Sequence, residues 1–596
     1  MIWYLTTPSL PARRVFSNGR TAQPVRANYG FALRIGRAPV GTLPAPMGSA
    51  AELFVRCLEN EGVRHVFGIP GEETLDLNEA LDASSTVEFI PVRHEQGGAF
   101  MADAYGRLTG RAGVCLGTLG PGATNLVTGM ADAFLDRAPI VALTGQTDLS
   151  AMHKESHQYI DVVRMMKPVT KWNARVHDPD IIPEVVRKAF AVAEQEKPGA
   201  THLELPADVM ESPLEGDPVP RRPPALVEPV AAELHRAAEL LQIAERPVIL
   251  AGNGIARQNA APALRRFVHQ TGLNVITTFM GKGVIDADDE HALFTAGLRA
   301  QDYPKGFMGQ ADLVLCVGYD LVEWSPVNWN PKRGRRVICV DTVAAEIDAH
   351  YVPDVELTGD ISHILTHLGN LVSDKPPARV VTPAYNQMIR EALESHSDDG
   401  FPVKPQRVLR DLRALMAPND LLISDVGAHK LWISRLWPAH EPNTVLISNG
   451  AAAMGFAVPA AVAARMVLPK DRRVVTISGD GGFLMNVQEL ETAKRLGLAI
   501  VNIVWSDSAY GVIEIHQQRK FGHLAGTKFT NPDLVRLAEA FGIAGMRVGS
   551  ADEVAPTLKR ALELDIPSVV EIPIDYRENA KFSMNLADLV KVGEGV

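Results

Sequence analysis

Short apolar runs alternate with helical stretches along most of this 596-residue chain. In its first third such runs cover residues 63–68, 87–91, 112–118 and 140–144, and longer stretches typical of helices separate them. Consecutive parallel strands need a long crossover, and that crossover usually contains a helix. The alternation therefore predicts a parallel sheet that is covered by helices on both faces.

The same alternation recurs in two further blocks of the sequence. Residues 213–229, rich in Pro and charge, are typical of a stiff exposed linker, and a second Pro-containing link covers residues 373–378. We therefore predict three doubly wound α/β domains, named here the first block (48–212), the central block (230–372) and the third block (380–578). Further strands are expected at residues 247–251, 313–317, 336–340, 421–424, 473–478, 499–505 and 568–572.

Residues 1–47 differ from the rest of the chain. They contain six Arg and six Pro but no Asp, Glu or Lys. An Arg-rich leader without acidic residues is typical of an organelle transit peptide. The alternative is a start codon assigned too early, because Met47 immediately precedes an amphipathic helical pattern. We favour the second explanation, and on either one we expect this segment to lie outside the fold.

Composition excludes several classes of protein. The formal net charge of −11 argues against a protein that mainly binds nucleic acid. Cys57, Cys115, Cys316 and Cys339 are too far apart for a disulfide framework or a structural zinc site and fit a reducing compartment. No apolar window approaches the 18 residues typical of a membrane span. We therefore expect a cytoplasmic enzyme that acts without a membrane.

The most specific motif lies in the third block, where the strand predicted at 473–478 runs into Gly479-Asp480-Gly481-Gly482. Glycines let the backbone approach a phosphate, and a following helix presents free N–H groups to an anion. The next predicted strand ends shortly before Asp507, so Asp480 and Asp507 share one carboxyl edge of the sheet. Gly-Asp-Gly also occurs in ordinary turns. Two carboxylates at this spacing, however, can complete an octahedral Mg²⁺ shell with a carbonyl, diphosphate oxygens and water.

This spacing resembles the diphosphate-binding motif of thiamine diphosphate enzymes. The resemblance implies that Asp480, Asp507 and the backbone carbonyl of Ala509 hold Mg²⁺. The family usually has Asn at the position of Asp507. An Asp there still binds Mg²⁺ and adds one negative charge to the site.

The first block carries the other half of the resemblance. In this family a Glu in the Arg-His-Glu run that ends here at Glu95 hydrogen-bonds N1′ of the aminopyrimidine and activates the cofactor. Burial is expected to raise the pKa of such a Glu; the alternative role is only to favour the helix dipole. Residues 118–125 resemble the family loop that places a small residue, here Gly120, beside the thiazolium ring. The alternative for that loop is an ordinary Gly-Pro-Gly turn.

Other positions of the family motif are carried over residue by residue. Met454 would support the bent cofactor, although a Met is more often a core residue. The backbone carbonyl of Ala452 would hold the 4′-amino group of the cofactor. Gln158 is expected on the substrate side. His157 and Lys171 resemble substrate-side positions but fit solvated surface residues better. The residues expected to contact the cofactor are Glu95, Val426, Gly427, Ala428, His429, Ala452, Met454, Gly479, Asp480, Gly481, Gly482, Asp507, Tyr510, Gly511 and Val512.

Over residues 48–580 the chain most resembles acetolactate synthases. Their catabolic branch lacks FAD and a regulatory subunit, and residues 316–330 look like its Tyr- and Trp-rich stretch rather than like the RFDDR-like run of FAD-containing members. A dinucleotide site is also unsupported, because Ala251–Ala256 lacks the full glycine fingerprint. Against this, the sequences around Glu95 and Gly120 look more like the biosynthetic branch. We expect thiamine diphosphate and Mg²⁺, and we expect neither FAD nor a regulatory subunit.

The resemblance implies decarboxylation of one pyruvate and condensation of the two-carbon fragment with a second pyruvate to 2-acetolactate. The site is expected between subunits of a homodimer or homotetramer, because the Glu of one subunit meets the diphosphate site of another in this family. The alternatives are another thiamine diphosphate decarboxylase or carboligase, an FAD-containing biosynthetic catalytic subunit, and a non-catalytic relative. Intact Glu95, Asp480 and Asp507 argue against the last of these.

Overall fold

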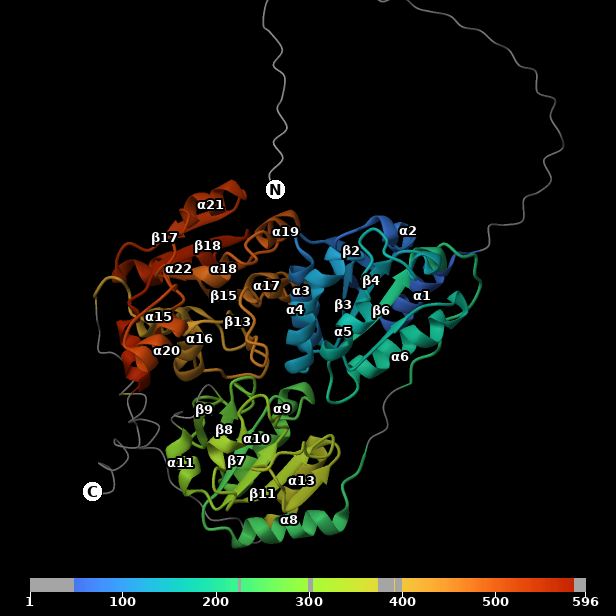
Figure 1. The fold of residues 1–596 in the computed structure, drawn as a ribbon. Coiled ribbons are helices and arrows are strands. Elements are labelled where there is room, and N and C mark those ends of the chain that lie inside the picture. The colour runs from blue at the N-terminus through green and yellow to red at the C-terminus, as the bar shows by residue number, and fades with distance from the viewer. Residues whose placement is uncertain (1–47, 223–226, 298–303, 374–390, 392–398, 584–596) are drawn as a thin grey trace, which may run out of the picture. The chain divides into compact units, whose positions relative to one another are not determined.

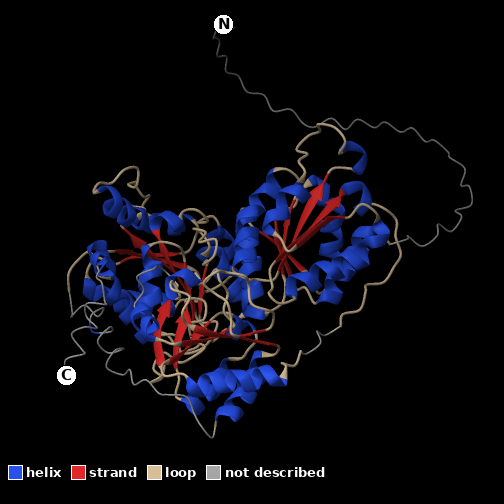
Figure 2. Ribbon diagram, turned by 60° about the horizontal axis from the view of Figure 1, so that its bottom comes forward, coloured by secondary structure: helices blue, strands red, loops and turns tan. Residues whose placement is uncertain are grey.

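The computed structural model describes residues 48–222, 227–297, 304–373, 391 and 399–583 (Figure 1). Three six-stranded sheets, all parallel, organise these residues, and helices lie on their faces (Figure 2). The prediction of three parallel α/β domains is confirmed, whereas the domain limits given above stay predictions. The segment 1–47, residues 223–226 of the first linker and residues 374–378 of the second lie outside the described residues.

The first sheet has the strand order β2-β1-β3-β4-β6-β5. Its strands are β1 (His65–Gly68), β2 (Glu88–Pro91), β3 (Gly113–Gly117), β4 (Ile140–Gln146), β5 (Trp172–Arg175) and β6 (Ala200–Pro206). Its helices are α1 (Ala50–Glu61), α2 (Leu75–Ala83), α3 (Glu95–Thr109), α4 (Pro121–Leu135), α5 (Val162–Met166), α6 (Ile182–Glu194) and α7 (Ala207–Met210). All four strands predicted for this block are present, within two residues at either end.

The third sheet repeats this order, as β14-β13-β15-β16-β18-β17. Its strands are β13 (Leu421–Ser424), β14 (Val445–Ile447), β15 (Val474–Gly479), β16 (Val501–Ser506), β17 (Ala544–Arg547) and β18 (Ser568–Pro573). Its helices are α15 (Pro405–Leu415), α16 (Ala428–Leu436), α17 (Ala457–Val467), α18 (Asp480–Phe483), α19 (Glu489–Arg495), α20 (Gly511–Phe521), α21 (Leu534–Ala540) and α22 (Val554–Leu562). The first and third blocks therefore share one topology without a repeat visible in the sequence.

The central sheet has a different order, β12-β11-β10-β7-β8-β9. Its strands are β7 (Pro247–Ala251), β8 (Asn274–Thr278), β9 (Ala292–Ala296), β10 (Leu313–Val317), β11 (Arg336–Asp341) and β12 (Val355–Thr358). Its helices are α8 (Ala231–Ile243), α9 (Gly254–Arg257), α10 (Ala261–Thr271), α11 (Pro304–Gln310), α12 (Pro326–Trp329) and α13 (Ile361–Val372). Numbered along the chain, this is the 3-2-1-4-5-6 order of dinucleotide-binding folds. The predicted strands 247–251 and 313–317 match β7 and β10 at both ends.

Helix α3 of the first block packs directly against helix α17 of the third. The two helices contribute to one hydrophobic cluster, in which the Phe100 and Phe456 rings meet edge to face at 5.5 Å. The α3 sequence has an N-cap at His94, which accepts from the backbone N–H of Gln96, and it ends at Gly110 in a left-handed conformation. This packing fixes the residue at the start of α3, Glu95, relative to the third block.

Within the described residues, every helix is too short or too polar to cross a lipid bilayer.

A buried histidine makes the first sheet sensitive to acid. His202 on β6 lies fully buried, with Nε2 2.8 Å from the Thr144 hydroxyl, and burial lowers its pKa to about 3. The unfolded chain binds a proton at His202 below its ordinary pKa of about 6.5 whereas the folded chain does not, so stability is lost as the pH falls toward 3.

We expect His202→Gln to reduce this pH dependence of the free energy of unfolding by about 1.4 kcal/mol per pH unit between pH 6 and 4. Denaturant titrations at several pH values measure it. The exposed control His235→Gln should keep the wild-type slope. Equal slopes for His202→Gln and wild type would contradict the assignment of a neutral His202.

Candidate active site

The carboxyl ends of β15 and β16 bring the two predicted carboxylates together. These strands pair in parallel, with Gly479 opposite Trp505, so Asp480 and Asp507 follow them at one edge of the sheet. The Asp480 carboxylate accepts the backbone N–H groups of Asp507 at 3.0 Å and Ser508 at 2.7 Å. It also accepts from the side-chain amide of Asn531 at 2.7 Å, a residue that the sequence argument did not identify. The Gly-Asp-Gly turn and the segment after β16 thus form one hydrogen-bonded unit.

Two carboxylates in this confined place repel each other. Burial, and then the neighbouring Asp480, raise the pKa of Asp507 to about 7. Asp480 itself is almost completely buried. A bound divalent cation would favour the ionised form of both groups. The donor set therefore fits a hard cation such as Mg²⁺ that prefers oxygen ligands.

A cavity of about 410 Å³ opens beside this pair. Its lining includes these residues predicted to bind the cofactor: Val426, Gly427, Ala428, His429, Ala452, Met454, Gly479, Asp480, Gly481, Gly482, Asp507, Tyr510, Gly511 and Val512, with Ala509 beside them. The cavity lining also includes Lys430, Leu431, Ile513, His516 and Tyr576, which are not among the residues predicted above to contact the cofactor. Lys430, Leu431 and Ile513 lie close to predicted residues in sequence, whereas His516 lies within α20 and Tyr576 lies beyond the end of β18.

Two helices begin at this cavity with their N-terminal N–H groups uncapped by side chains. Helix α16 follows Gly427 and helix α20 follows Tyr510, and neither preceding residue makes a side-chain cap hydrogen bond. Such helix starts bind phosphate groups. His429 lines the same cavity, and its buried Nε2 has no hydrogen-bond partner. Burial lowers the His429 pKa to about 4, so the imidazole is neutral. These groups fit the diphosphate of a cofactor.

The turn after β14 carries Ala452 and Met454 into the cavity and is held by buried charges of the first block. Asp136, at the end of α4, accepts the backbone N–H groups of Asn449 at 2.7 Å and Gly450 at 2.5 Å. Ala452 takes a positive φ of 50°, and the backbone N–H of Gly455 is held by the Asp425 carboxylate. The conformation of this turn therefore depends on contacts with Asp136 at the end of α4 and with Asp425, which follows β13.

Asp136 belongs to a cluster of three aspartates around Arg107, which lies in the last turn of α3. Its guanidinium is buried and forms ion pairs with Asp103 at 2.6 Å and Asp136 at 2.9 Å, and it lies 3.6 Å from Asp132. The Ser448 hydroxyl donates to Asp132 and accepts from the backbone N–H of Ala453. A continuous polar network thus runs from α3 to the turn that lines the cavity.

The first block forms a separate half-site. Glu95 is 6% exposed and accepts from the Asn125 amide at 2.9 Å. A Cβ placed on Gly122 would lie 3.4 Å from the Glu95 carboxylate, and one placed on Gly120 would lie 2.8 Å from the Gln158 carbonyl. Glu95, Gly120 and Gln158 are thus gathered at one edge of the first sheet. Among the described residues, the cavity lining includes none from the first block.

The two less specific candidates lie apart from each other. His157 is exposed next to Gln158. Lys171 precedes β5, which is the outer strand on one side of the sheet, whereas Glu95 follows β2, the outer strand on the other side. The Lys171 ammonium group donates to the Gln195 carbonyl at 2.6 Å. Lys171 is therefore not brought to this half-site.

Glu489, which the sequence argument missed, connects the two halves within one chain. Its carboxylate accepts the backbone N–H groups of Arg93 and His94, each at 3.1 Å, just before α3. A Cβ on Gly97 would lie 2.6 Å from this carboxylate, so a larger residue there would displace the Glu489 side chain. Burial raises the pKa of Glu489 to about 7. The start of α3, with Glu95, is thereby held by the third block.

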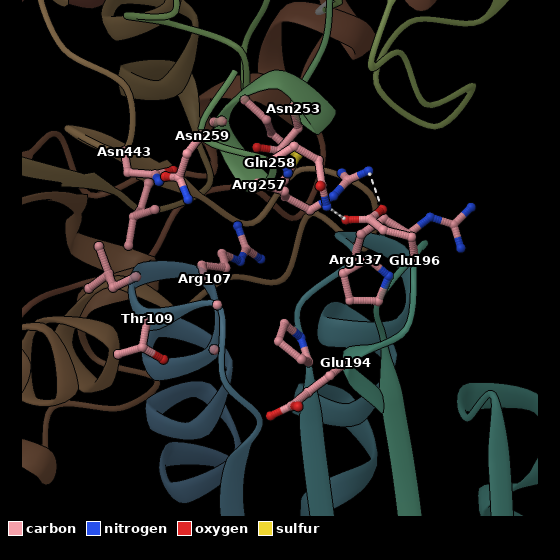
Figure 3. Close-up of a pocket in the computed structure, with 18 of the residues that line it drawn as sticks. Arg107, Thr109, Arg137, Glu194, Glu196, Asn253, Arg257, Gln258, Asn259 and Asn443 are labelled. Atoms are coloured by element: carbon pink, nitrogen blue, oxygen red, sulfur yellow. Dashed lines mark hydrogen bonds and ion pairs between the residues drawn. The ribbon is translucent and has the colours of Figure 1, made fainter. Parts of the chain in front are cut away.

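A second, smaller cavity of about 170 Å³ lies at the carboxyl end of the central sheet (Figure 3). Charged and amide side chains from all three blocks line it, and Glu196 contacts both Arg257 and Gln258. Arg257 also pairs with Asp320 at 2.8 Å, and Lys197 pairs with Asp320 at 2.7 Å. Ion pairs therefore lie at the edge where a fold of this order binds dinucleotides.

Comparison with known proteins gives matches in each of the three blocks. Residues 48–165 match the family described as "Thiamine pyrophosphate enzyme, N-terminal TPP binding domain". Residues 234–368 match the central domain of such enzymes, and residues 425–572 match their C-terminal TPP binding domain.

Similar proteins cover nearly the whole chain. "Acetolactate synthase, catabolic" of Raoultella terrigena is 38% identical over 540 residues, which are 89% of this chain and 95% of the relative. "Acetolactate synthase" of Bacillus subtilis (strain 168) is 36% identical, with 89% and 94% covered. "Probable acetolactate synthase large subunit" of Methanocaldococcus jannaschii is 33% identical, with 89% and 92% covered. The chain belongs to the acetolactate synthase family of thiamine pyrophosphate enzymes.

Membership of the acetolactate synthase family identifies the two half-sites as parts of thiamine pyrophosphate-binding domains. The match of residues 425–572 includes Asp480 and Asp507, and the match of residues 48–165 includes Glu95. The predictions of the family, the fold and a thiamine diphosphate enzyme are confirmed. The roles of individual residues stay predictions.

We expect Asp136→Asn to destabilise the fold by about 2 kcal/mol, because an amide cannot accept from both backbone N–H groups and also pair with Arg107. It should also weaken cofactor binding, because the turn with Ala452 and Met454 loses its anchor. Thermal unfolding and a titration with thiamine diphosphate measure the two effects. The exposed control Asp82→Asn should change neither, and wild-type behaviour of Asp136→Asn would contradict this role of the network.

Proposed function

We propose that this protein is an acetolactate synthase that joins two molecules of pyruvate, with loss of one CO₂, to 2-acetolactate. The observation that carries the proposal is the 410 Å³ cavity whose lining contains the diphosphate motif and both carboxylates. Relatives named acetolactate synthase that cover 89% of the chain support the choice of reaction.

Thiamine diphosphate, when bound, supplies the carbon nucleophile and accepts the electron pair that the leaving CO₂ releases. The starts of α16 and α20 would bind its diphosphate. Asp480, Asp507 and the Ala509 carbonyl would hold Mg²⁺. Met454 and the Ala452 carbonyl would orient the ring system across the cavity. The buried Glu95 carboxyl would share a proton with N1′ of the pyrimidine.

We propose that the complete site forms between two subunits. In one chain Glu95 is fixed by Asn125 and by the packing of α3, and the cavity lining contains no first-block residue among those described. A second copy, related by a twofold axis, would supply its Glu95 half-site to this cavity and would give two sites per dimer. A homodimer or a homotetramer built from such dimers satisfies this requirement.

We further propose that the enzyme needs neither FAD nor a regulatory subunit, as expected for the catabolic branch. The cavity at the dinucleotide edge of the central sheet, about 170 Å³, is smaller than the 300–1,000 Å³ typical of ligand pockets. Arg257 and Glu196 both line this cavity and form an ion pair, which a larger ligand would have to break. Similarity to the catabolic relative supports the same choice.

We place the enzyme in the cytoplasm. Cys57, Cys115, Cys316 and Cys339 are buried and unpaired, which suits a reducing compartment. Fractionation of cells with an antibody to the chain tests this location.

Product analysis tests the proposed reaction. Purified protein receives pyruvate, Mg²⁺ and thiamine diphosphate without FAD, and acetoin is measured before and after acid treatment, which converts acetolactate to acetoin. Acetoin that appears only after acid supports the proposal. Acetaldehyde as the product would make the enzyme a simple decarboxylase, and activity that requires added FAD would contradict the cofactor assignment.

We expect Glu95→Gln to bind the cofactor with nearly wild-type affinity but to lose at least about 100-fold in kcat, the usual contribution of a general acid or base. A cofactor titration and steady-state kinetics separate the two effects. The exposed control Glu88→Gln should retain full activity. Full turnover by Glu95→Gln would remove this carboxyl from the mechanism.

We expect Asp480→Asn to lose affinity for Mg²⁺ and cofactor first, because the cation loses a charged ligand. Its activity should recover in part at high concentrations of both, which kinetic titration measures. An unchanged cofactor affinity would contradict the metal assignment.

Mixing the two variants, at a cofactor and Mg²⁺ concentration too low to restore Asp480→Asn, tests the intersubunit site. Glu95→Gln and Asp480→Asn chains, dissociated and reassembled in equal amounts, should recover about a quarter of the wild-type activity, because half of the dimers are mixed and each mixed dimer has one intact site. If both residues act within one chain, the mixture stays inactive.

A further inference from the structure

Two histidines and an aspartate meet at the surface of the central block. His269 lies in the last turn of α10, and Asp289 and His291 lie in the loop that leads into β9. The Nε2 atom of His269 is 3.1 Å from one oxygen of Asp289, and the Nδ1 atom of His291 is 2.9 Å from the other. Both imidazoles thus converge on a single carboxylate. None of these residues lines the cofactor cavity.

The arrangement suits a transition-metal ion. One ligand atom from each residue lies within 4.8 Å of the other two, and the two rings stand at 90° with their centroids 5.5 Å apart. Zn²⁺ with bonds of about 2.0–2.1 Å to nitrogen and oxygen separates neighbouring tetrahedral ligands by about 3.3 Å. Small movements of the side chains would therefore admit the ion. Two imidazoles favour zinc-like ions over Mg²⁺ or Ca²⁺.

We propose that His269, Asp289 and His291 form a binding site for Zn²⁺ or a similar divalent transition-metal ion, with a fourth position for water. The side chain of His269 is 59% exposed, so an ion can enter from solvent. Asp289 and His291 are mostly buried, and the backbone N–H of His291 already orients the Asp289 carboxylate. Glu290, the neighbour of both loop ligands, adds to the negative potential that attracts a cation.

The position of the site indicates a structural role. The ion would join α10 to the loop of residues 286–291. The other end of this loop contacts the third block, where the backbone N–H of Ala287 donates to the Ala439 carbonyl at 3.1 Å and Asp286 pairs with His440 at 2.9 Å. Because the ion would bind only the folded chain, it should raise the thermal stability of this junction. It would take no part in the chemistry at the cofactor.

Two other sets of side chains must be distinguished from this site. Asp286 and Asp288 of the same loop form a second cluster with His440 of the third block. His363 and His367 on α13 stack on one exposed helix face with their Nε2 atoms 2.5 Å apart, a spacing that also attracts metal ions. A background variant with His363→Ala and His367→Ala removes the latter pair. His269→Ala and His440→Ala are then compared in that background.

The experiment uses the untagged holoenzyme saturated with Mg²⁺ and thiamine diphosphate, so that the catalytic metal site is occupied. Calorimetric titration with Zn²⁺ measures affinity and stoichiometry, and visible absorption of added Co²⁺ reports the coordination. We expect one ion per chain in the background variant, absorption typical of nitrogen ligands in low coordination, and a rise in melting temperature. His269→Ala should bind Zn²⁺ at least about tenfold more weakly and lose the rise in melting temperature. Loss of a group that only hydrogen-bonds to a metal ligand already costs about 10–100-fold in metal affinity, and loss of a ligand itself should cost at least as much.

His440→Ala should keep both the affinity and the rise in melting temperature. Equal binding by His269→Ala and its background variant would overturn the proposal. Loss of binding in His440→Ala alone would place the ion in the second cluster and would also overturn it. His269 is exposed, so its substitution leaves the fold intact and the comparison stays decisive. Acetolactate formation is measured on the same samples as a separate readout. The result for Zn²⁺ binding therefore does not depend on whether the proposed function is correct.

Discussion

The packing of α3 against α17 is the contact on which both halves of the site depend. Helix α3 begins with Glu95, and its last turn carries Arg107 into a buried cluster of three aspartates. Removal of Arg107 would leave three buried carboxyl groups without a cation, which costs several kcal/mol. The cluster extends through Asp136 to the turn that bears Ala452 and Met454. One helix thus positions Glu95 in one half-site and supports the turn that lines the cavity of the other.

The shared topology of the first and third blocks explains why both half-sites lie at carboxyl ends of strands. In each sheet the strands run in the order 2-1-3-4-6-5, so equivalent edges are available for ligands in both blocks. The third block places glycines and two carboxylates at this edge, whereas the first places Glu95 and a glycine-containing loop there. The central block has the order of a dinucleotide fold, but ion pairs occupy the corresponding edge.

The sequence predicts the strands and the diphosphate half of the site well, because both depend on short-range signals. Apolar runs bounded by turns locate β7 and β10 to the residue, and the residues from Gly479 to Gly482 mark a strand end directly. It does not predict Asn531, Glu489 or Asp136, because each acts through contacts with residues far away in the chain. A single Asn, Glu or Asp outside a motif resembles any surface residue. The repeated topology is likewise invisible, since strand order depends on tertiary pairing.

The contacts around Glu95 argue for assembly rather than for closure of a single chain. Glu95 does not line the cavity of its own chain, and a movement of α3 out of its place would break its packing against α17 and the hydrogen bonds from the backbone N–H groups of Arg93 and His94 to Glu489. Each lost hydrogen bond to a buried carboxylate costs about 1.5–3 kcal/mol, in addition to the apolar surface exposed along α3. In the proposed dimer, a second copy would present its own Glu95 with these contacts kept. The contacts that hold Glu95 in place within one chain therefore support the proposal that the site assembles from two subunits.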